Sequence, residues 1–307
     1  MYSFKRIMVG LDLTLMDRTL IQYTAFLSYY LAPEKIYFVN IQKDLDIPDE
    51  ITAEYPDVKY PRDEKIREEM EREARLYFPD FEDYGTSFEV IEGSPRREML
   101  RWSHNKDIDL LLVGHKVLSN GSGIIPRQLA RKVSCSVLFV PETVSLKLDR
   151  IMIANDFSPY AKAAFESALA FGTHNPDLQI VSNYIYTVPY GYYRTGKTEQ
   201  QFARIMETNA REKFKNFLGD LDVNGAEIKS AFTYNHPKIS PAHFLYEHAM
   251  KEKADILMAG ARGKNAITAM FLGSVTERLI ELDFEIPLLV VKQKENSFNL
   301  NALIESV

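Results

Sequence analysis

Short apolar runs alternate with amphipathic stretches along the whole chain. The runs at residues 110–113 and 137–140 contain no polar residue at alternate positions. Continuous runs of this kind are typical of strands buried on both faces, as in parallel sheets. By contrast, Ala161, Ala164 and Phe165 recur at the spacing of one helix face. The pattern therefore predicts an α/β protein in which strands and helices alternate.

A similar series of segments occurs twice, in the same order. The matched segments are 7–14 and 151–158, 109–114 and 255–260, and 137–141 and 288–292. Repetition of this kind predicts tandem copies of one domain. We expect a first domain at residues 1–145, a second at 146–293 and a C-terminal tail at 294–307.

The elements within each half follow one plan. After the first strand, Thr14 in one half and Ser158 in the other are natural helix N-caps, and Pro159 suits the first helical position. The further predicted strands are 35–41, 87–91, 179–185 and 227–233, and the charged helices are 63–78 and 199–218. Alternation of this kind predicts, in each half, a doubly wound parallel sheet of five strands. Ligands of such sheets bind beyond the carboxyl ends of the strands.

A glycine-rich segment follows the predicted fourth strand of the second half. Gly260 and Gly263 are followed, nine residues later, by Gly273 and Ser274. The sequence from Ser274 to Glu277 predicts a capping box, with Ser274 as the N-cap of a helix. A helix N-terminus carries roughly half a positive charge, which favours an anion. The alternative is that these glycines form ordinary turns and that Ser274 is only a cap.

The spacing Gly260-x2-Gly263-x9-Gly273-Ser274 matches the G-2x-G-9x-G(S/T) nucleotide motif of universal stress proteins. Both halves resemble that family, over residues 1–141 and 149–292. The resemblance implies a Rossmann-like, adenine nucleotide α hydrolase-like fold and a site for ATP, ADP or AMP, with or without Mg²⁺. It implies that adenosine is held by Asp156 and the backbone of Ile185. The ribose and phosphates would be held by Gly260, Arg262, Gly263, Gly273, Ser274 and Val275.

The first half departs from this motif. Gly114 is followed by His115 and lacks the second glycine, and the next glycines come at residues 121–123, which is too early. Asp12 remains at the end of the first strand, where we interpret it as a turn residue. We expect a degenerate domain that binds no adenine nucleotide, while a different ligand stays open.

Composition narrows the class of protein. The chain has 43 acidic and 37 basic residues, a net charge of −6, which argues against a broad nucleic-acid-binding surface. The one cysteine, Cys135, cannot form an internal disulfide and is expected to be buried. The N-terminus does not resemble a signal peptide, and no apolar run approaches the ~20 residues that span a bilayer. These observations predict a cytoplasmic protein with neither nucleic-acid nor membrane partners.

Other candidate motifs favour structural roles. His243 and His248 are five residues apart, which does not place two metal ligands on one helix face. The acidic residues Asp44, Asp46 and Asp49 lack the rest of a calcium loop. The segment 121–123 is not a nucleophile elbow. The basic residues Arg96, Arg97, Arg101, Arg127, Arg131 and Lys132 are interpreted as solvated helix faces rather than as an anion-binding strip.

The resemblance implies a stress-response protein that acts as a nucleotide-binding regulatory module, with a regulatory protein partner that the sequence does not identify. No placed general base or Walker lysine argues for catalysis, but a slow ATPase, an adenylyl-transferring enzyme and a nucleotide-free scaffold stay open. The resemblance also implies intramolecular pairing of the domains through the strands at 136–140 and 287–291, with a homodimer left open. The apolar spacing of Leu300, Leu303, Ile304 and Val307 predicts a short helix in the tail.

Overall fold

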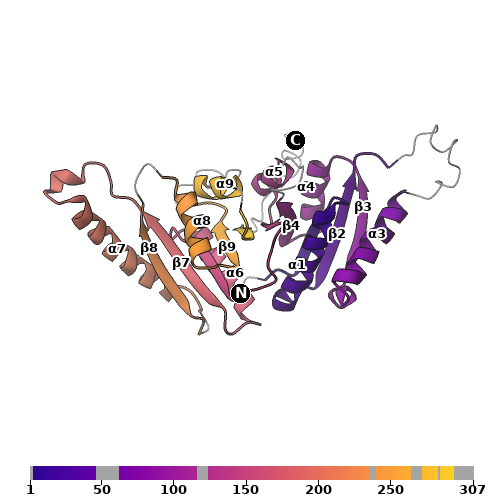
Figure 1. Cartoon of the computed structure of the whole chain (residues 1–307), viewed down its shortest axis with the longest axis horizontal. Helices are drawn as coiled ribbons and strands as arrows, with labels where there is room; N and C mark the ends of the chain where they lie inside the picture. The colour runs from indigo at the N-terminus through magenta and orange to yellow at the C-terminus, as the bar shows by residue number, and fades with distance from the viewer. Residues whose placement is uncertain are drawn as a thin grey trace. The chain divides into compact units, whose positions relative to one another are not determined.

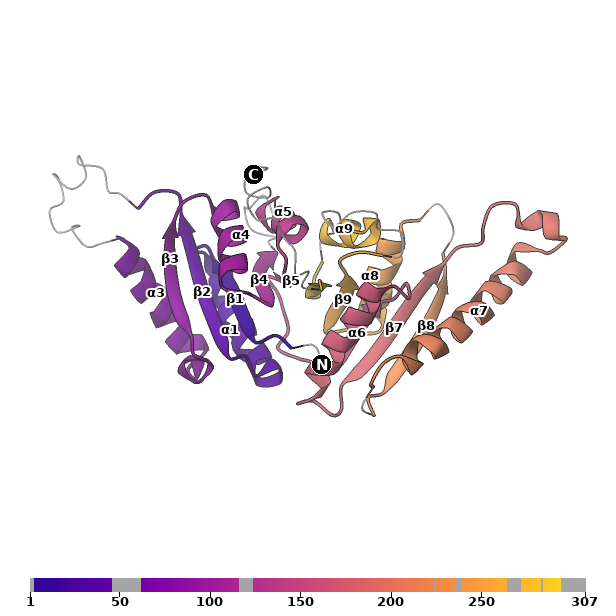
Figure 2. The same cartoon turned by 180° about the vertical axis from the view of Figure 1, so that it is seen from behind.

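The computed structural model describes residues 3–45, 62–115, 124–223, 225–235, 239–263, 272–282 and 284–293, with the backbone alone for 124–126. These residues form two α/β units, one within residues 3–144 and one within 145–293. Each unit has five strands that pair in parallel (Figures 1 and 2). The predicted fold class, two tandem doubly wound domains with five-stranded parallel sheets, is confirmed.

The first domain follows the strand order β3-β2-β1-β4-β5. Its strands are β1 (Arg6–Leu11), β2 (Lys35–Gln42), β3 (Ser87–Glu92), β4 (Leu110–His115) and β5 (Ser136–Pro141). Its helices are α1 (Leu15–Leu31), α3 (Arg62–Tyr77), α4 (Pro95–Asn105) and α5 (Ile124–Lys132), with a 3₁₀ turn η2 (Phe81–Tyr84). Helices α1 and α3 pack together on one face of the sheet, and α4 and α5 pack together on the other. The sheet is thus covered on both faces, as its continuous apolar strands require.

The second domain repeats this order as β8-β7-β6-β9-β10. Its strands are β6 (Arg150–Ala154), β7 (Gln179–Tyr186), β8 (Ile228–Tyr234), β9 (Ile256–Gly260) and β10 (Leu288–Val291). Its helices are α6 (Pro159–Gly172), α7 (Glu199–Gly219), α8 (Pro241–Lys251) and α9 (Ser274–Ile280), with a 3₁₀ turn η3 (Tyr192–Thr195). Helices α6 and α7 lie on one face, whereas α8 and α9 pack against each other on the opposite face.

The predicted helix starts agree with the structure in both domains. The Thr14 hydroxyl accepts a hydrogen bond from the backbone N–H of Met16, and the Ser158 hydroxyl accepts one from Ala161 at 3.1 Å. Pro159 occupies the first turn of α6, where no backbone donor is needed. These caps begin each helix directly after the strand, so the connecting loop lies at the carboxyl end of the sheet.

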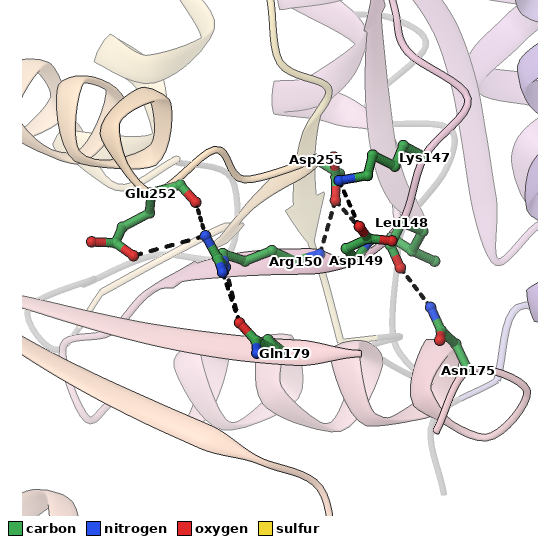
Figure 3. Close-up of polar contacts among 8 residues, drawn as sticks. All are labelled: Lys147, Leu148, Asp149, Arg150, Asn175, Gln179, Glu252 and Asp255. Carbon is green, nitrogen blue, oxygen red and sulfur yellow. Dashed lines mark hydrogen bonds and ion pairs between the residues drawn. The ribbon is translucent and has the colours of Figure 1, made fainter. Parts of the chain in front are cut away.

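A polar cluster fixes the amino ends of the strands in the second domain (Figure 3). The carboxylate of Asp255, just before β9, accepts hydrogen bonds from the backbone N–H groups of Asp149 and Arg150 at 2.7 and 2.8 Å. The Arg150 guanidinium donates to the side chain of Gln179 in β7 and to the backbone carbonyl of Glu252 after α8. The cluster therefore joins β6 to β7 and to the α8–β9 connection.

The first domain has the same arrangement. Asp109 accepts a hydrogen bond from the backbone N–H of Arg6 at 2.8 Å, and the Arg6 guanidinium donates to the carbonyl of Lys106 at 2.7 Å. We call the pairs Asp109–Arg6 and Asp255–Arg150 the amino-end clamps. Because they lie at the opposite end of the strands from the expected ligand site, we interpret them as structural.

Several predictions fall wholly or partly outside the described residues. They are the helix at 300–307, the glycine segment 121–123, and Asp46 and Asp49. Cys135 is described and is buried, as expected. Among the described helices, none is long and apolar enough to cross a bilayer.

Candidate functional site

The loop after β6 holds the Asp156 carboxylate at the carboxyl end of the sheet. One of its oxygens accepts a hydrogen bond from the backbone N–H of Ser158 at 3.0 Å. The side-chain oxygen of the preceding Asn155 accepts one from Phe157 at 2.8 Å. Phe157 itself adopts a left-handed conformation, with φ of 60°. This turn fixes Asp156 by two local hydrogen bonds and a conformation that non-glycine residues rarely adopt.

Gly263, in the segment after β9, packs directly against Asp156. A Cβ atom at position 263 would lie 2.7 Å from the second carboxylate oxygen of Asp156, and a Cβ at position 273 would lie 3.3 Å from the backbone nitrogen of Gly263. Both approaches are closer than ordinary van der Waals contact, so larger residues would displace the loop or the carboxylate. The fold thus brings together Asp156, Gly263 and Gly273, which are far apart in the sequence.

Gly260 has a structural role of its own. A Cβ atom there would lie 2.8 Å from backbone and side-chain atoms of Tyr160 in the first turn of α6. The Gly260 carbonyl accepts a hydrogen bond from the Thr276 hydroxyl at 2.8 Å. Gly260 therefore lets α6 approach β9, and the Thr276 hydroxyl is used within the protein.

The predicted capping box is wrong. The N-cap of α9 is Gly273 rather than Ser274, and it makes no side-chain capping bond. The N–H of Gly273 donates to the carbonyl of Ala261 at 2.8 Å, which holds residue 273 in an extended conformation just before the helix. Ser274 is consequently the first helical residue and is exposed, and Val275 beside it is half-buried.

Arg262 lies between Gly260, the last residue of β9, and Gly263, and its side chain contacts α6. Its guanidinium stands 5.3 Å from the centre of the Tyr160 ring and donates a hydrogen bond to the Tyr160 hydroxyl at 2.7 Å. A guanidinium stacked on a ring and hydrogen-bonded at the same residue has little freedom. The Arg262 guanidinium is therefore held against Tyr160 in the first turn of α6.

Ile185 lies near the end of β7, beyond the last paired residue of β6. The Asn183 carbonyl accepts a hydrogen bond from the N–H of Asn155, just after β6. Backbone groups two residues apart in a strand point to the same neighbouring strand. The backbone of Ile185 is therefore directed past the end of β6, toward the loop that carries Asp156.

An aromatic pair adjoins this loop. The rings of Phe157 and Tyr184 are 4.6 Å apart, and burial together with the Asp156 charge raises the pKa of Tyr184. Four further residues shape the site but could not be predicted from the sequence: Asn155, Phe157, Tyr160 and Tyr184. The only sequence signal for Asn155 is its place beside Asp156, and the other three residues belong to no motif.

In the first domain, the corresponding loop after β1 forms hydrogen bonds with side chains of its own residues and of the first turn of α1. The two carboxylate oxygens of Asp17, in the first turn of α1, accept hydrogen bonds from the backbone N–H groups of Asp12 and Leu13 at 2.9 and 2.8 Å. The Asp12 carboxylate accepts a further bond from Thr14 at 2.6 Å. Asp12 is thus engaged within its own turn, in agreement with its interpretation as a turn residue.

The end of β4 also differs from that of β9. His115 is buried at the position that the repeat aligns with Ala261. A Cβ atom at Gly114 would lie 2.6 Å from the Met16 side chain, whereas the matching atom at Gly260 meets the backbone of Tyr160. An imidazole therefore occupies space that a methyl group occupies in the second domain.

The described residues contain no group of three or more His, Cys, Asp or Glu side chains arranged to hold a metal ion. His248 instead makes a side-chain hydrogen bond: the amide nitrogen of Asn183 lies 2.8 Å from its Nδ1. The hydroxyl of Thr233 donates to the amide oxygen of the same asparagine at 3.1 Å. This arrangement joins α8 to β7 and β8 beneath the site.

Comparisons with known proteins agree with this architecture. The model of the universal stress protein family matches residues 3–141 and again residues 147–292. The universal stress protein MJ0577 of Methanocaldococcus jannaschii is 25% identical over 167 residues, which cover 50% of this chain and all of that protein.

Two solved structures illustrate the range of likeness. A universal stress protein from Archaeoglobus fulgidus superposes with a TM-score of 0.60 at 17% identity, covering 96% of this chain and 98% of its own. A universal stress protein in complex with cAMP matches 47% of this chain and 95% of its own, at 21% identity and a TM-score of 0.29. The first likeness supports the fold, and the second bears only on what that relative binds. The family model matches this chain twice, and the two matches together cover nearly the whole chain. The chain therefore belongs to the universal stress protein family and carries two of its domains in tandem.

Proposed function

We propose that the second domain binds one adenine nucleotide and that the chain acts as a regulatory binding module. The observation that carries this proposal is the packing of Gly263 against Asp156 and of Gly273 against Gly263, which leaves no room for a side chain at either glycine. Glycines at such approaches allow a ligand to lie close to the backbone. Family relatives bind nucleotides, as the cAMP complex of one of them illustrates.

The proposed roles follow from position. Asp156 would accept hydrogen bonds from the adenosine, whose base would also meet the backbone of Ile185. The backbone at Gly260, Gly263 and Gly273 would lie along the ribose and phosphates. The Arg262 guanidinium, the exposed hydroxyl of Ser274 and the backbone of Val275 would add contacts to the phosphates. ATP is the proposed ligand, and ADP and AMP share all the adenosine contacts.

The first domain is proposed to bind no adenine nucleotide. The Asp17 carboxylate already accepts hydrogen bonds from the backbone N–H groups of Asp12 and Leu13, and a buried His115 stands at the position of Ala261. We also propose, from the sequence and the family resemblance, that the protein is cytoplasmic and has a regulatory protein partner. On the same grounds, we propose that the two domains pair through their last strands.

Calorimetric titration with ATP tests the assignment. Wild type should bind one nucleotide per chain, and Gly263→Val or Gly273→Val should abolish binding because each adds atoms within a close contact. Asp156→Ala should weaken binding ten- to a hundredfold, the equivalent of about 1.5–3 kcal/mol for one lost charge-assisted contact. The matched control is Gly219→Val, because nothing lies within 4 Å of a Cβ at that position.

Asp12→Ala separates the two domains and should leave ATP affinity unchanged. Uptake of two nucleotides, or full binding by Gly273→Val, would place the site elsewhere. No binding by wild type would favour the nucleotide-free scaffold. Recovery of ADP rather than ATP after prolonged incubation would instead favour the slow ATPase.

A further inference from the structure

Two helices of the first domain carry a strong excess of positive charge. Their cations are Arg96, Arg97, Arg101, Arg127, Arg131 and Lys132. The only acidic residue in α4 and α5 is Glu98. The two helices thus have a net charge of +5, and because the whole chain has a net charge of −6, the remainder carries −11.

The fold gathers these cations on one face of the first sheet. Helices α4 and α5 lie side by side in both views (Figures 1 and 2). The Arg96 guanidinium donates to the side-chain oxygen of Gln128 across the two helices at 2.7 Å. Burial and the nearby charge of Arg96 lower the pKa of Lys132, so two like charges approach each other here. We call this surface of α4 and α5 the basic face.

Glu98, the one acidic residue of α4 and α5, is itself largely buried. Its side chain is only 10% exposed and pairs with Arg101 at 2.6 Å. A Cβ atom at Gly93 would lie 2.9 Å from the Glu98 side chain, which shows how closely the carboxylate arm packs on the preceding turn. Arg97, Arg101 and Arg131 are exposed. The exposed charged side chains of α4 and α5 are therefore all cationic.

The second domain provides an internal comparison. In the equivalent helices, α8 carries Glu247 and Lys251, and α9 carries Glu277 and Arg278, so their formal charges balance. The same helix pair thus forms without a basic excess. The charge on α4 and α5 is therefore a property of the first domain and not a requirement of the fold.

We propose that the basic face is a docking surface for a short acidic segment of a partner polypeptide. Five of its six cations are arginines, whose planar guanidinium groups pair with carboxylates through two parallel hydrogen bonds. The longer helix, with 11 residues, spans about 16 Å, which suits a short segment. A long polyanion such as nucleic acid would extend onto the remaining surface, whose net negative charge repels it.

Fluorescence anisotropy on the full-length protein tests this proposal. The probes are a labelled oligo-glutamate peptide and an oligothymidylate of the same net charge, both at low salt. Wild type should bind the peptide more tightly than the oligothymidylate, and binding should weaken steeply as salt is added. The double variant Arg97→Glu, Arg131→Glu should bind the peptide at least tenfold more weakly, since two attractions become repulsions.

The control is Lys213→Glu, Lys215→Glu, which reverses two exposed charges on α7 in the second domain. It should bind the peptide like wild type. A second double variant, Arg97→Gln with Arg131→Gln, removes the two charges without reversing them. It should also bind the peptide more weakly than wild type, and it replaces the first variant if charge reversal disturbs folding. An equal loss in the α7 variant, unchanged binding by the α4–α5 variants, absent peptide binding, or tighter binding of the oligothymidylate would each overturn the proposal.

Discussion

Leu13 and Phe157 hold equivalent positions in the two domains, and both have φ of 60°. A left-handed conformation costs a non-glycine residue roughly 1–2 kcal/mol. Each domain stabilises it differently. In the first domain, Asp17 in helix α1 accepts the N–H of Leu13, whereas in the second domain Asn155, two residues before Phe157, accepts the N–H of Phe157. The turn is thus retained while the side chain that supports it differs.

Asp17→Ala should therefore destabilise the first domain. It leaves the N–H groups of Asp12 and Leu13 without their carboxylate acceptor, at a cost of about 1–3 kcal/mol in the free energy of unfolding. Urea unfolding of the purified variant measures this loss. Glu64→Ala removes the same charge from an exposed position on α3 and should change stability little. Equal midpoints for the two variants would contradict the role of Asp17.

His248 predicts a pH dependence of stability. Burial lowers its pKa below the usual 6.5, while Glu252 acts in the opposite direction and Lys251 reinforces the lowering. The unfolded chain then binds more protons than the folded chain at pH values just below 6.5. The stability that neutral His248 contributes to the free energy of unfolding is fully present above pH 6.5. It is lost as the pH falls toward the pKa of His248 in the folded state.

Thermal unfolding between neutral pH and mildly acidic pH measures this effect. His248→Gln keeps a side-chain amide for Asn183 but cannot titrate, so its stability should fall less on acidification than that of wild type. His104→Gln, at an exposed position on α4, should follow the wild-type curve. Parallel curves for wild type and His248→Gln would show that the imidazole does not contribute.

At the scale of elements, α7 is attached in two different ways. Of its 21 residues, only Ala210 and Phe214 are buried, and both lie in its second half. In the first turn, the Glu199 carboxylate accepts a hydrogen bond from the Tyr234 hydroxyl, which raises the pKa of Tyr234 to about 12. That phenol therefore stays protonated at neutral pH, and it ceases to donate to Glu199 as the pH rises through about 12.

Tyr234→Phe should loosen the first half of α7 alone. Without the phenol, amide hydrogen exchange should accelerate over residues 199–209 and remain unchanged over 210–219, because Ala210 and Phe214 still pack on the sheet. Exchange followed by mass spectrometry resolves the two halves. Tyr190→Phe removes a phenol that is 95% exposed and should leave both halves as in wild type. Uniform acceleration along the helix would show that α7 behaves as one unit.

The elements were largely predictable from sequence because they depend on local patterns. Apolar runs placed the strands, and Thr14 and Ser158 placed the starts of α1 and α6. The start of α9 was misplaced because the Gly273 N–H bonds to Ala261, a contact of the folded loop that no S-x-x-E pattern reveals. Asp17 was missed for a similar reason. Its role depends on a turn that returns to the strand end.

At the scale of the molecule, the proposed asymmetry between the domains predicts where ATP protects the backbone. Saturating ATP should slow hydrogen exchange in the second domain over residues 155–158 and 260–263, next to Asp156 and Gly263. The matching segments of the first domain, 11–14 and 114–115, should be unaffected. Asp156→Ala at the same ATP concentration serves as the control. Equal protection of both domains would contradict the asymmetry.

The amino-end clamps have a consequence for engineering. Asp109–Arg6 and Asp255–Arg150 are retained in both copies, whereas the turns at the opposite end of the strands have diverged. The two ends of the sheet therefore have separate roles. The amino ends stabilise the fold, and the loops at the carboxyl ends can be replaced. Transplanting binding chemistry into the first domain should then require changes at three places, Met16, Asp17 and His115, in addition to a new glycine segment. Such a chimera would carry a second copy of the proposed ligand site on one polypeptide without alteration of its sheets.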